Sequence, residues 1–113
     1  MLKNLTSHEV CIYKLNGVTS DLDVVIEASD TIARVSCEYI KVDKKVAGID
    51  LYRPVFGEVT GLPEYKEGTY LLVSTMVREA LPLRKDLVSP GQLLRNDKGE
   101  VIGCLGLVGN FNN

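Results

Sequence analysis

Short apolar runs alternate with turn-forming residues along most of the chain, a pattern typical of a strand-rich fold. The clearest run covers residues 32–42, where Ala33, Val35, Cys37 and Tyr39 fall on one face and mainly polar side chains on the other. This alternation predicts a half-buried strand. Further strands are expected over residues 8–15, 23–28, 49–59, 69–73, 92–95 and 101–107.

Turn residues predict how these strands are connected. Asn16-Gly17 favours a tight hairpin turn because both residues tolerate positive φ, and Asn96-Asp97-Lys98-Gly99 predicts a second hairpin. Turns or loops are also expected at Ser89-Pro90-Gly91 and at residues 60–63. Pro54 lacks an amide donor, so its strand is expected at a sheet edge or a bulge.

One short helix is expected, from about Thr75 to Leu81. Ser74 or Thr75 suits its N-cap, and Pro82 ends it because proline cannot continue the backbone hydrogen bonds. The pattern therefore predicts a mainly β (α+β) fold, a small barrel or a curled antiparallel sheet with this helix. We expect residues 1–113 to form a single domain whose tail frays from about Gly109.

Composition limits the classes of function. With 113 residues, 45% of them apolar, a net charge of −2 and dispersed basic residues, the chain lacks the basic footprint of general nucleic-acid binding. Cys11, Cys37 and Cys104 are widely spaced, which disfavours a disulfide framework or a zinc site and predicts core positions. No run has the length of a signal peptide or a membrane helix, so a cytoplasmic location is expected and membrane association is not.

The sequence contains no recognisable catalytic motif. His8 is the only histidine, and no serine or cysteine lies in a nucleophile signature. Glu58 and Glu64 could pair for acid–base work, but solvated charges at strand ends are the better explanation. We therefore expect that the protein is not an enzyme and that it binds no metal or cofactor. A small hydrolase that uses His8 with Ser74 or Glu58 is an alternative hypothesis.

A strand that runs directly into the helix suggests a ligand site. The first turn of that helix offers free amides and the hydroxyls of Ser74 and Thr75, a combination that favours anions. Arg78, Arg84 and Arg53 would add guanidinium groups suited to phosphate, and Phe56 a stacking surface. The alternative is that Ser74 only caps the helix and that the arginines lie on the surface.

Several segments spread over nearly the whole chain carry a resemblance. They are Asn4-Leu5-Thr6-Ser7-His8, the segment Phe56-Gly57-Glu58-Val59-Thr60-Gly61-Leu62-Pro63, Leu72-Val73-Ser74, residues 84–87 through Pro90-Gly91, and residues 99–104. In these segments the chain resembles a group of small proteins encoded by phages, prophages and some actinobacteria. That group usually has proline before the histidine, where this chain has Ser7.

The resemblance implies a phage or prophage origin. Small phage proteins are often inhibitors of host defence, and one strategy is to sequester nucleotide-derived immune signals in a pocket, commonly between subunits of an oligomer. The leading hypothesis is therefore a non-catalytic protein that captures a small anionic, nucleotide-derived ligand in the cytoplasm of an infected bacterium. Such a protein could form a homo-oligomer. The second hypothesis is a protein–protein inhibitor or structural accessory protein that docks through a strand edge.

Overall fold

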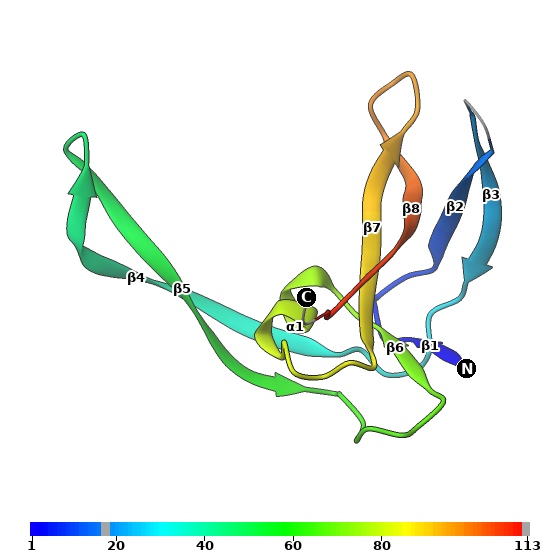
Figure 1. The fold of residues 1–113 in the computed structure, drawn as a ribbon, viewed down its shortest axis with the longest axis horizontal. Coiled ribbons are helices and arrows are strands. Elements are labelled where there is room, and N and C mark those ends of the chain that lie inside the picture. Colours follow the sequence, from blue (N-terminus) through cyan, green and yellow to red (C-terminus); the bar gives the residue numbers. More distant parts are fainter. Residues whose placement is uncertain (17–18, 112–113) are drawn as a thin grey trace.

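The computed structural model describes residues 1–16 and 19–111, which form eight strands and one short helix (Figure 1). The elements are β1 (Leu2–Asn4), β2 (Val10–Asn16), β3 (Thr19–Ile26), β4 (Arg34–Val46), β5 (Ile49–Thr60), β6 (Tyr70–Leu72), α1 (Thr75–Ala80), β7 (Leu87–Arg95) and β8 (Val101–Gly109). The mainly β fold with one short helix confirms the prediction. Within the described ranges, no helix has the length and apolar character needed to cross a membrane.

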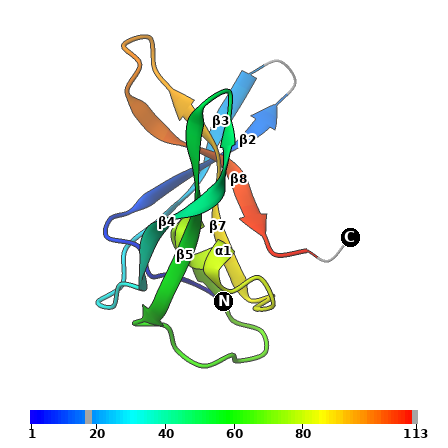
Figure 2. The same cartoon turned by 90° about the vertical axis from the view of Figure 1, so that its left-hand side faces the viewer.

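Six strands form one strongly curled sheet in the order β1-β6-β7-β8-β2-β3 (Figures 1 and 2). Both predicted hairpins are present as the antiparallel pairs β2–β3 and β7–β8, although Gly17 of the Asn16-Gly17 turn lies outside the described residues. The pairs β1–β6, β6–β7 and β2–β8 are parallel, so the sheet is mixed. The sequence does not reveal them because parallel partners lie far apart in the chain and β1 is too short to show alternation.

Two apolar cores lie on opposite faces of this sheet. Leu71 and Leu72 are neighbours in β6, so their side chains point to opposite faces. Leu71 belongs to a core formed with Leu5, Ala33, Val73, Val77 and Leu87, which includes the buried side of α1. Leu72 belongs to the other, with Val10, Ile12 and Cys104. Cys104 is thus a core residue as predicted, whereas Cys11 and Cys37 are only half-buried.

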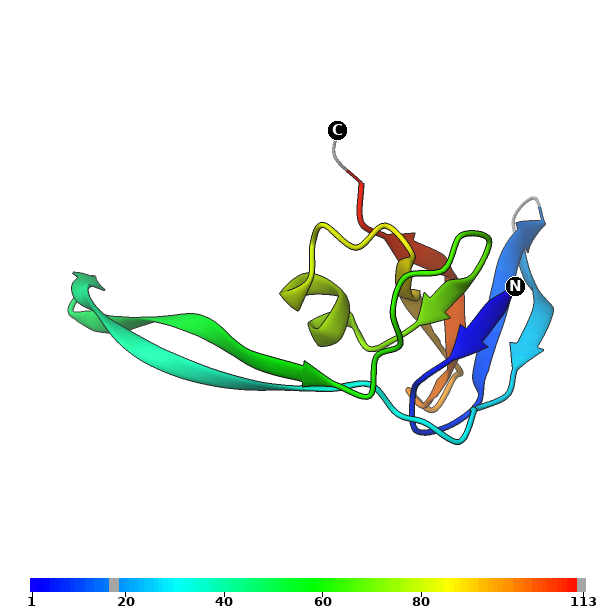
Figure 3. The ribbon, with the colours of Figure 1, turned by 90° about the horizontal axis from the view of Figure 1, so that it is seen from below.

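The strands β4 and β5 form a separate two-stranded ribbon that projects away from the curled sheet (Figures 1 and 3). We call this ribbon, residues 34–60, the arm. At its base Val35 and Val59 pack against the core around Leu71, but Tyr39, farther out on the same face, is 69% exposed. The prediction of a half-buried strand over residues 32–42 is therefore correct only at the base, because the ribbon leaves the sheet beyond it.

The Ser89-Pro90-Gly91 segment was predicted as a turn, but it lies inside β7. Pro90 pairs with Leu107 of β8, and a Cβ atom on Gly91 would overlap the carbonyl oxygen of Leu105. Glycine and proline therefore mark a close approach of two strands here. Composition alone does not separate that role from a turn.

The tail was expected to fray from about Gly109, but β8 continues through Gly109 and Asn110 is buried. The Nδ2 group of Asn110 lies 3.0–3.3 Å from the carbonyl oxygens of Arg78, Leu81 and Arg84 and donates to them. These carbonyls belong to the end of α1 and the loop after it, where backbone acceptors lack helical partners. The tail therefore caps the helix.

Gly61, directly after β5, is held in the left-handed region with φ +78°, and a Cβ atom there would overlap the carbonyl oxygen of Ile32. We expect Gly61→Ala to lower the free energy of unfolding by about 2 kcal/mol, because it adds steric overlap to backbone strain. Gly99 is the matched control, since its φ is +80° and nothing lies within 4 Å of an added Cβ. Urea unfolding of both variants checks this, and equal losses would contradict the proposed overlap.

Candidate functional site

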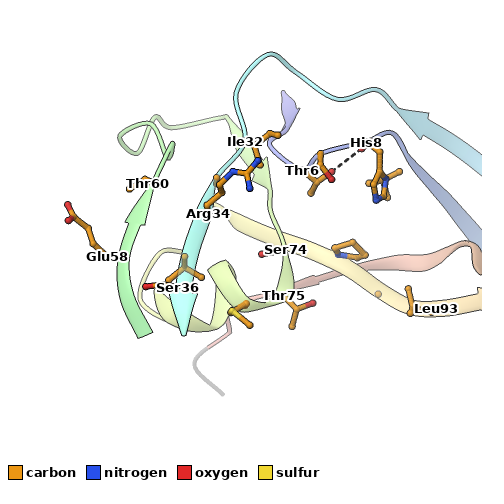
Figure 4. A pocket seen from close by; sticks show the side chains of 17 residues that line it. Thr6, His8, Ile32, Arg34, Ser36, Glu58, Thr60, Ser74, Thr75 and Leu93 are labelled. Atoms are coloured by element: carbon orange, nitrogen blue, oxygen red, sulfur yellow. Dashed lines mark hydrogen bonds between the residues drawn. The ribbon is translucent and has the colours of Figure 1, made fainter. Parts of the chain in front are cut away.

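An open hollow lies where the base of the arm, the start of α1 and the middle of β7 meet the loop between β1 and β2 (Figure 4). We call it the base pocket. Its volume is about 890 Å³, within the range of small-molecule pockets. The polar side chains that line it are those of Thr6, Ser7, His8, Arg34, Ser36, Glu58, Thr60, Ser74 and Thr75.

The loop that brings Thr6 and His8 to the base pocket is held by Asn4, which is only 2% exposed. The Asn4 Nδ2 group donates to the carbonyl oxygens of His8, at 3.1 Å, and Ile26, at 2.9 Å. Its Oδ1 accepts from the Thr6 amide at 2.9 Å and lies 2.6 Å from the Thr6 hydroxyl. One buried amide group therefore fixes this rim of the pocket.

His8 lines the base pocket through an imidazole ring whose two nitrogens differ in their hydrogen bonding. Its Nδ1 lies 2.8 Å from the carbonyl oxygen of Glu9, and because a carbonyl can only accept, Nδ1 carries the proton. No partner of Nε2 occurs in the part of the chain that the structure describes. Nε2 can accept a hydrogen bond from a ligand when the ring is neutral and donate one when it is protonated.

Arg34, at the first position of β4, is the arginine that lines the base pocket. Its side chain is exposed and extends toward the side on which Thr6 and His8 lie (Figure 4). Within residues 1–16 and 19–111 it makes no hydrogen bond or ion pair. A guanidinium without a protein partner at the rim of a pocket is available to a carboxylate or phosphate.

Ser74 and Thr75 line the base pocket, as the anion-site hypothesis requires, but fewer free backbone amides are available there than expected. α1 has only six residues, and the Ser74 hydroxyl accepts from the Val77 amide at 3.3 Å. Ser74 therefore caps the helix, which is the alternative considered from sequence. What remains for a ligand on this side of the pocket is chiefly the two hydroxyl groups.

Arg78 was predicted as an anion contact, but its guanidinium binds protein groups. Its Nε donates to the Ser89 hydroxyl at 2.7 Å and its Nη1 to Asn110 Oδ1 at 3.2 Å. Arg78 thus ties α1 to β7 and the tail. Substituting it would perturb the fold and would not report on ligand binding alone.

Arg84, a second predicted contact, forms a forked ion pair with Asp86. Its Nε and Nη2 lie 2.8 and 2.6 Å from the two carboxylate oxygens, and Nη2 also donates to the carbonyl of Pro63 at 3.2 Å. The hydrogen bond from Arg84 lowers the pKa of Asp86, and the same bond raises the pKa of Arg84. This pair anchors the loop after α1 and lies outside the base pocket.

Arg53 and Phe56 both lie on the arm. Arg53 pairs across the ribbon with Ile40, and Phe56 pairs with Cys37. Neither lines the base pocket. Of the six residues predicted as one ligand site, the structure brings only Ser74 and Thr75 together there. Arg53 and Phe56 lie on the arm, away from the pocket. Arg78 and Arg84 are held by hydrogen bonds to protein groups.

Sequence reasoning missed Arg34 and gave His8 no binding role. Arg34 pairs with Thr60, and both lie on the polar face of the arm's base beside Ser36. The alternation of β4 gave a partial signal, since it placed Arg34 and Ser36 on one face. The Glu58 carboxylate points away from the other labelled side chains (Figure 4), so the rim facing the loop is cationic and hydroxyl-rich.

Fold and site together define a β-rich protein with an open pocket at the base of a projecting arm, lined by hydroxyl groups and by apolar surface. In the described ranges, no group of three or more His, Cys, Asp or Glu side chains could hold a metal ion. Comparisons with protein-family models, with curated proteins and with solved structures found no match to this chain.

Proposed function

We propose that the protein is a non-enzymatic binding protein that captures a small anionic, nucleotide-derived ligand in the base pocket. The observation that carries the proposal is Arg34, whose guanidinium has no partner in the described chain and lies at the rim of a hollow of about 890 Å³. Arginine suits phosphate because its planar fork donates two parallel hydrogen bonds. Sequestration of an immune signal, which the resemblance to phage proteins implies, is the biological role we propose for this binding.

The other groups of the pocket complement this role. His8 Nε2 and the hydroxyls of Thr6, Ser36 and Thr75 can bind the polar edges of a base or sugar. Val10 and Leu93 provide apolar surface beside them. A few polar groups on a partly apolar wall are the usual composition of a small-molecule site.

A thermal-shift screen with cyclic nucleotides and ADP-ribose derivatives tests the proposal. A ligand at a hundredfold excess over its dissociation constant stabilises the folded state by about 2.7 kcal/mol, which gives a clear rise in Tm. Mass spectrometry of small molecules released from protein purified out of cells with active immune signalling would identify the ligand. No shift with any nucleotide and no released ligand would contradict it. Product that accumulates with time and is lost in His8→Ala would instead indicate the hydrolase.

We expect Arg34→Ala to weaken binding of the ligand by about 10- to 100-fold, the effect of removing hydrogen bonds to a charged group. Arg53→Ala is the matched control, because it removes an arginine from the same arm outside the pocket. Isothermal titration calorimetry of both variants measures the difference. Unchanged affinity in Arg34→Ala would show that the ligand binds elsewhere.

A further inference from the structure

The outer part of the arm, residues 39–53, exposes an unusual amount of apolar surface. Tyr39 and Tyr52 lie on one face and are 69% and 56% exposed, and Ile40, on the other face, is 42% exposed. Near the tip Val46 and Ile49 are 54% and 67% exposed. An isolated two-stranded ribbon is at best marginally stable in water, and this one projects beyond the rest of the molecule (Figures 1 and 3). A surface of this kind is typical of an interface.

The dimensions of the chain support the same reading. Its radius of gyration is 16.6 Å, against about 13 Å for a compact domain of this length. Its accessible surface is 8109 Å², about 2,000 Å² more than the roughly 6,100 Å² expected for a monomer of this mass. A stable interface needs only about 800 Å² from each partner. The excess is therefore large enough for a specific assembly.

The same chain carries a surface that complements the outer arm. The outer arm holds Lys41, Lys44, Lys45 and Arg53 against Asp43 and Asp50. β3, which ends the order of the curled sheet, carries Asp21 and Asp23 and no cation, and Lys14 of β2 lies 4.0 Å from Asp23. Leu22, Val24 and Val25 of β3 are 39–52% exposed. A cationic apolar ribbon and an acidic apolar edge strand match in both charge and character.

We propose that the outer arm packs against the β2–β3 edge of a second copy of this chain. The two surfaces lie on opposite sides of the molecule (Figure 1), so an arm reaches the edge of a neighbour and not its own. A reciprocal exchange, in which each copy gives its arm and receives the other, closes the assembly as a dimer with two equivalent contacts. This inference does not depend on the ligand proposed for the base pocket.

Sedimentation velocity of the full chain over a range of concentrations is the first test. We expect the mass of a dimer, twice the 12.4 kDa of the single chain. A monomer at about 100 μM, far above the dissociation constants of specific interfaces, overturns the proposal and leaves the arm to a different partner. Tyr52→Ser should weaken association at least tenfold. Tyr65→Ser is its matched control, because Tyr65 is similarly exposed at 61% but lies outside the arm.

A charge exchange then tests which surfaces meet. One variant carries Lys44→Glu and Lys45→Glu, and the other carries Asp21→Lys and Asp23→Lys. Each alone should associate at least tenfold more weakly than the original chain, because its arm and edge then repel. An equimolar mixture should restore association, since the arm and edge of different variants attract again. Assembly that persists in both variants, or a mixture that stays dissociated while each variant remains folded by circular dichroism, overturns the proposed contact.

Discussion

Asn4→Asp is expected to cost about 3 to 5 kcal/mol of the free energy of unfolding, the loss typical of an unpaired buried charge. Asn4 is buried, and its Nδ2 group donates to the carbonyl oxygens of His8 and Ile26. An ionised carboxylate has no donor, so both carbonyls would face a negative oxygen. Because a domain of this size has only about 5 to 15 kcal/mol in total, the variant should be close to unfolding.

The pH dependence of this variant separates charge from shape. Protonation of the introduced carboxyl restores one donor, and burial favours the protonated form. The deficit of Asn4→Asp should therefore shrink as the pH falls from about 7 to about 5, within the range that buried carboxyls reach. Gln92→Glu, at an exposed position of β7 whose side chain makes no hydrogen bond within the described residues, is the control and should change the free energy of unfolding by less than about 0.5 kcal/mol. A deficit that does not vary with pH would contradict this explanation.

Asp86→Asn should destabilise the protein by about 2 to 3 kcal/mol at neutral pH, the value of strong hydrogen bonds to a charged group. Asp86 is 3% exposed, and both of its oxygens accept from the Arg84 guanidinium. Asparagine keeps the shape, but its NH₂ group would face an Arg84 donor. Arg84 would then remain partly buried without its counter-charge.

The sign of the pH effect follows from the lowered pKa of Asp86, which the hydrogen bond from Arg84 causes. The carboxylate stabilises the fold fully above the pKa of an unfolded aspartate, about 3.9, and this contribution is lost as the pH falls through the lower folded value. The difference in the free energy of unfolding between the original chain and Asp86→Asn should therefore be largest near pH 7 and become smaller below about pH 4. Urea unfolding at several pH values measures it, with Asp97→Asn as the control in an exposed turn. A gap that stays constant with pH would contradict a role for the charge.

Local pattern predicted the hairpins and the helix well. The alternating runs on either side of Asn96-Asp97-Lys98-Gly99 do form β7 and β8, and the helix begins at Thr75 and stops before Pro82. These features depend on residues close in sequence, through turn geometry, capping and the missing amide of proline. The Ser89-Pro90-Gly91 segment was predicted wrongly as a turn, because its conformation depends on pairing with β8 and not on its neighbours in sequence.

The sequence did not show which of the predicted residues lie together at the base pocket, and particular contacts explain why. Arg78 and Arg84 were read as ligand contacts from their residue type, but their partners Ser89, Asn110 and Asp86 become neighbours only in the folded chain. Among the residues that the structure describes, Arg34 makes no such bonds, and nothing in its local sequence distinguishes it from the arginines that do. A guanidinium is available to a ligand only if the fold leaves it unpaired.

The sequence by itself determined the strand-rich class, the two hairpins and the short capped helix, because alternation, turn residues and capping act over a few neighbouring residues. Only the tertiary structure decided that strands near the two ends of the chain pair in parallel. It also decided that the tail caps α1, that the arm leaves the sheet, and that Arg34 faces the base pocket while other arginines are bound. These outcomes depend on contacts between residues far apart in the chain, whose free energy no local pattern encodes.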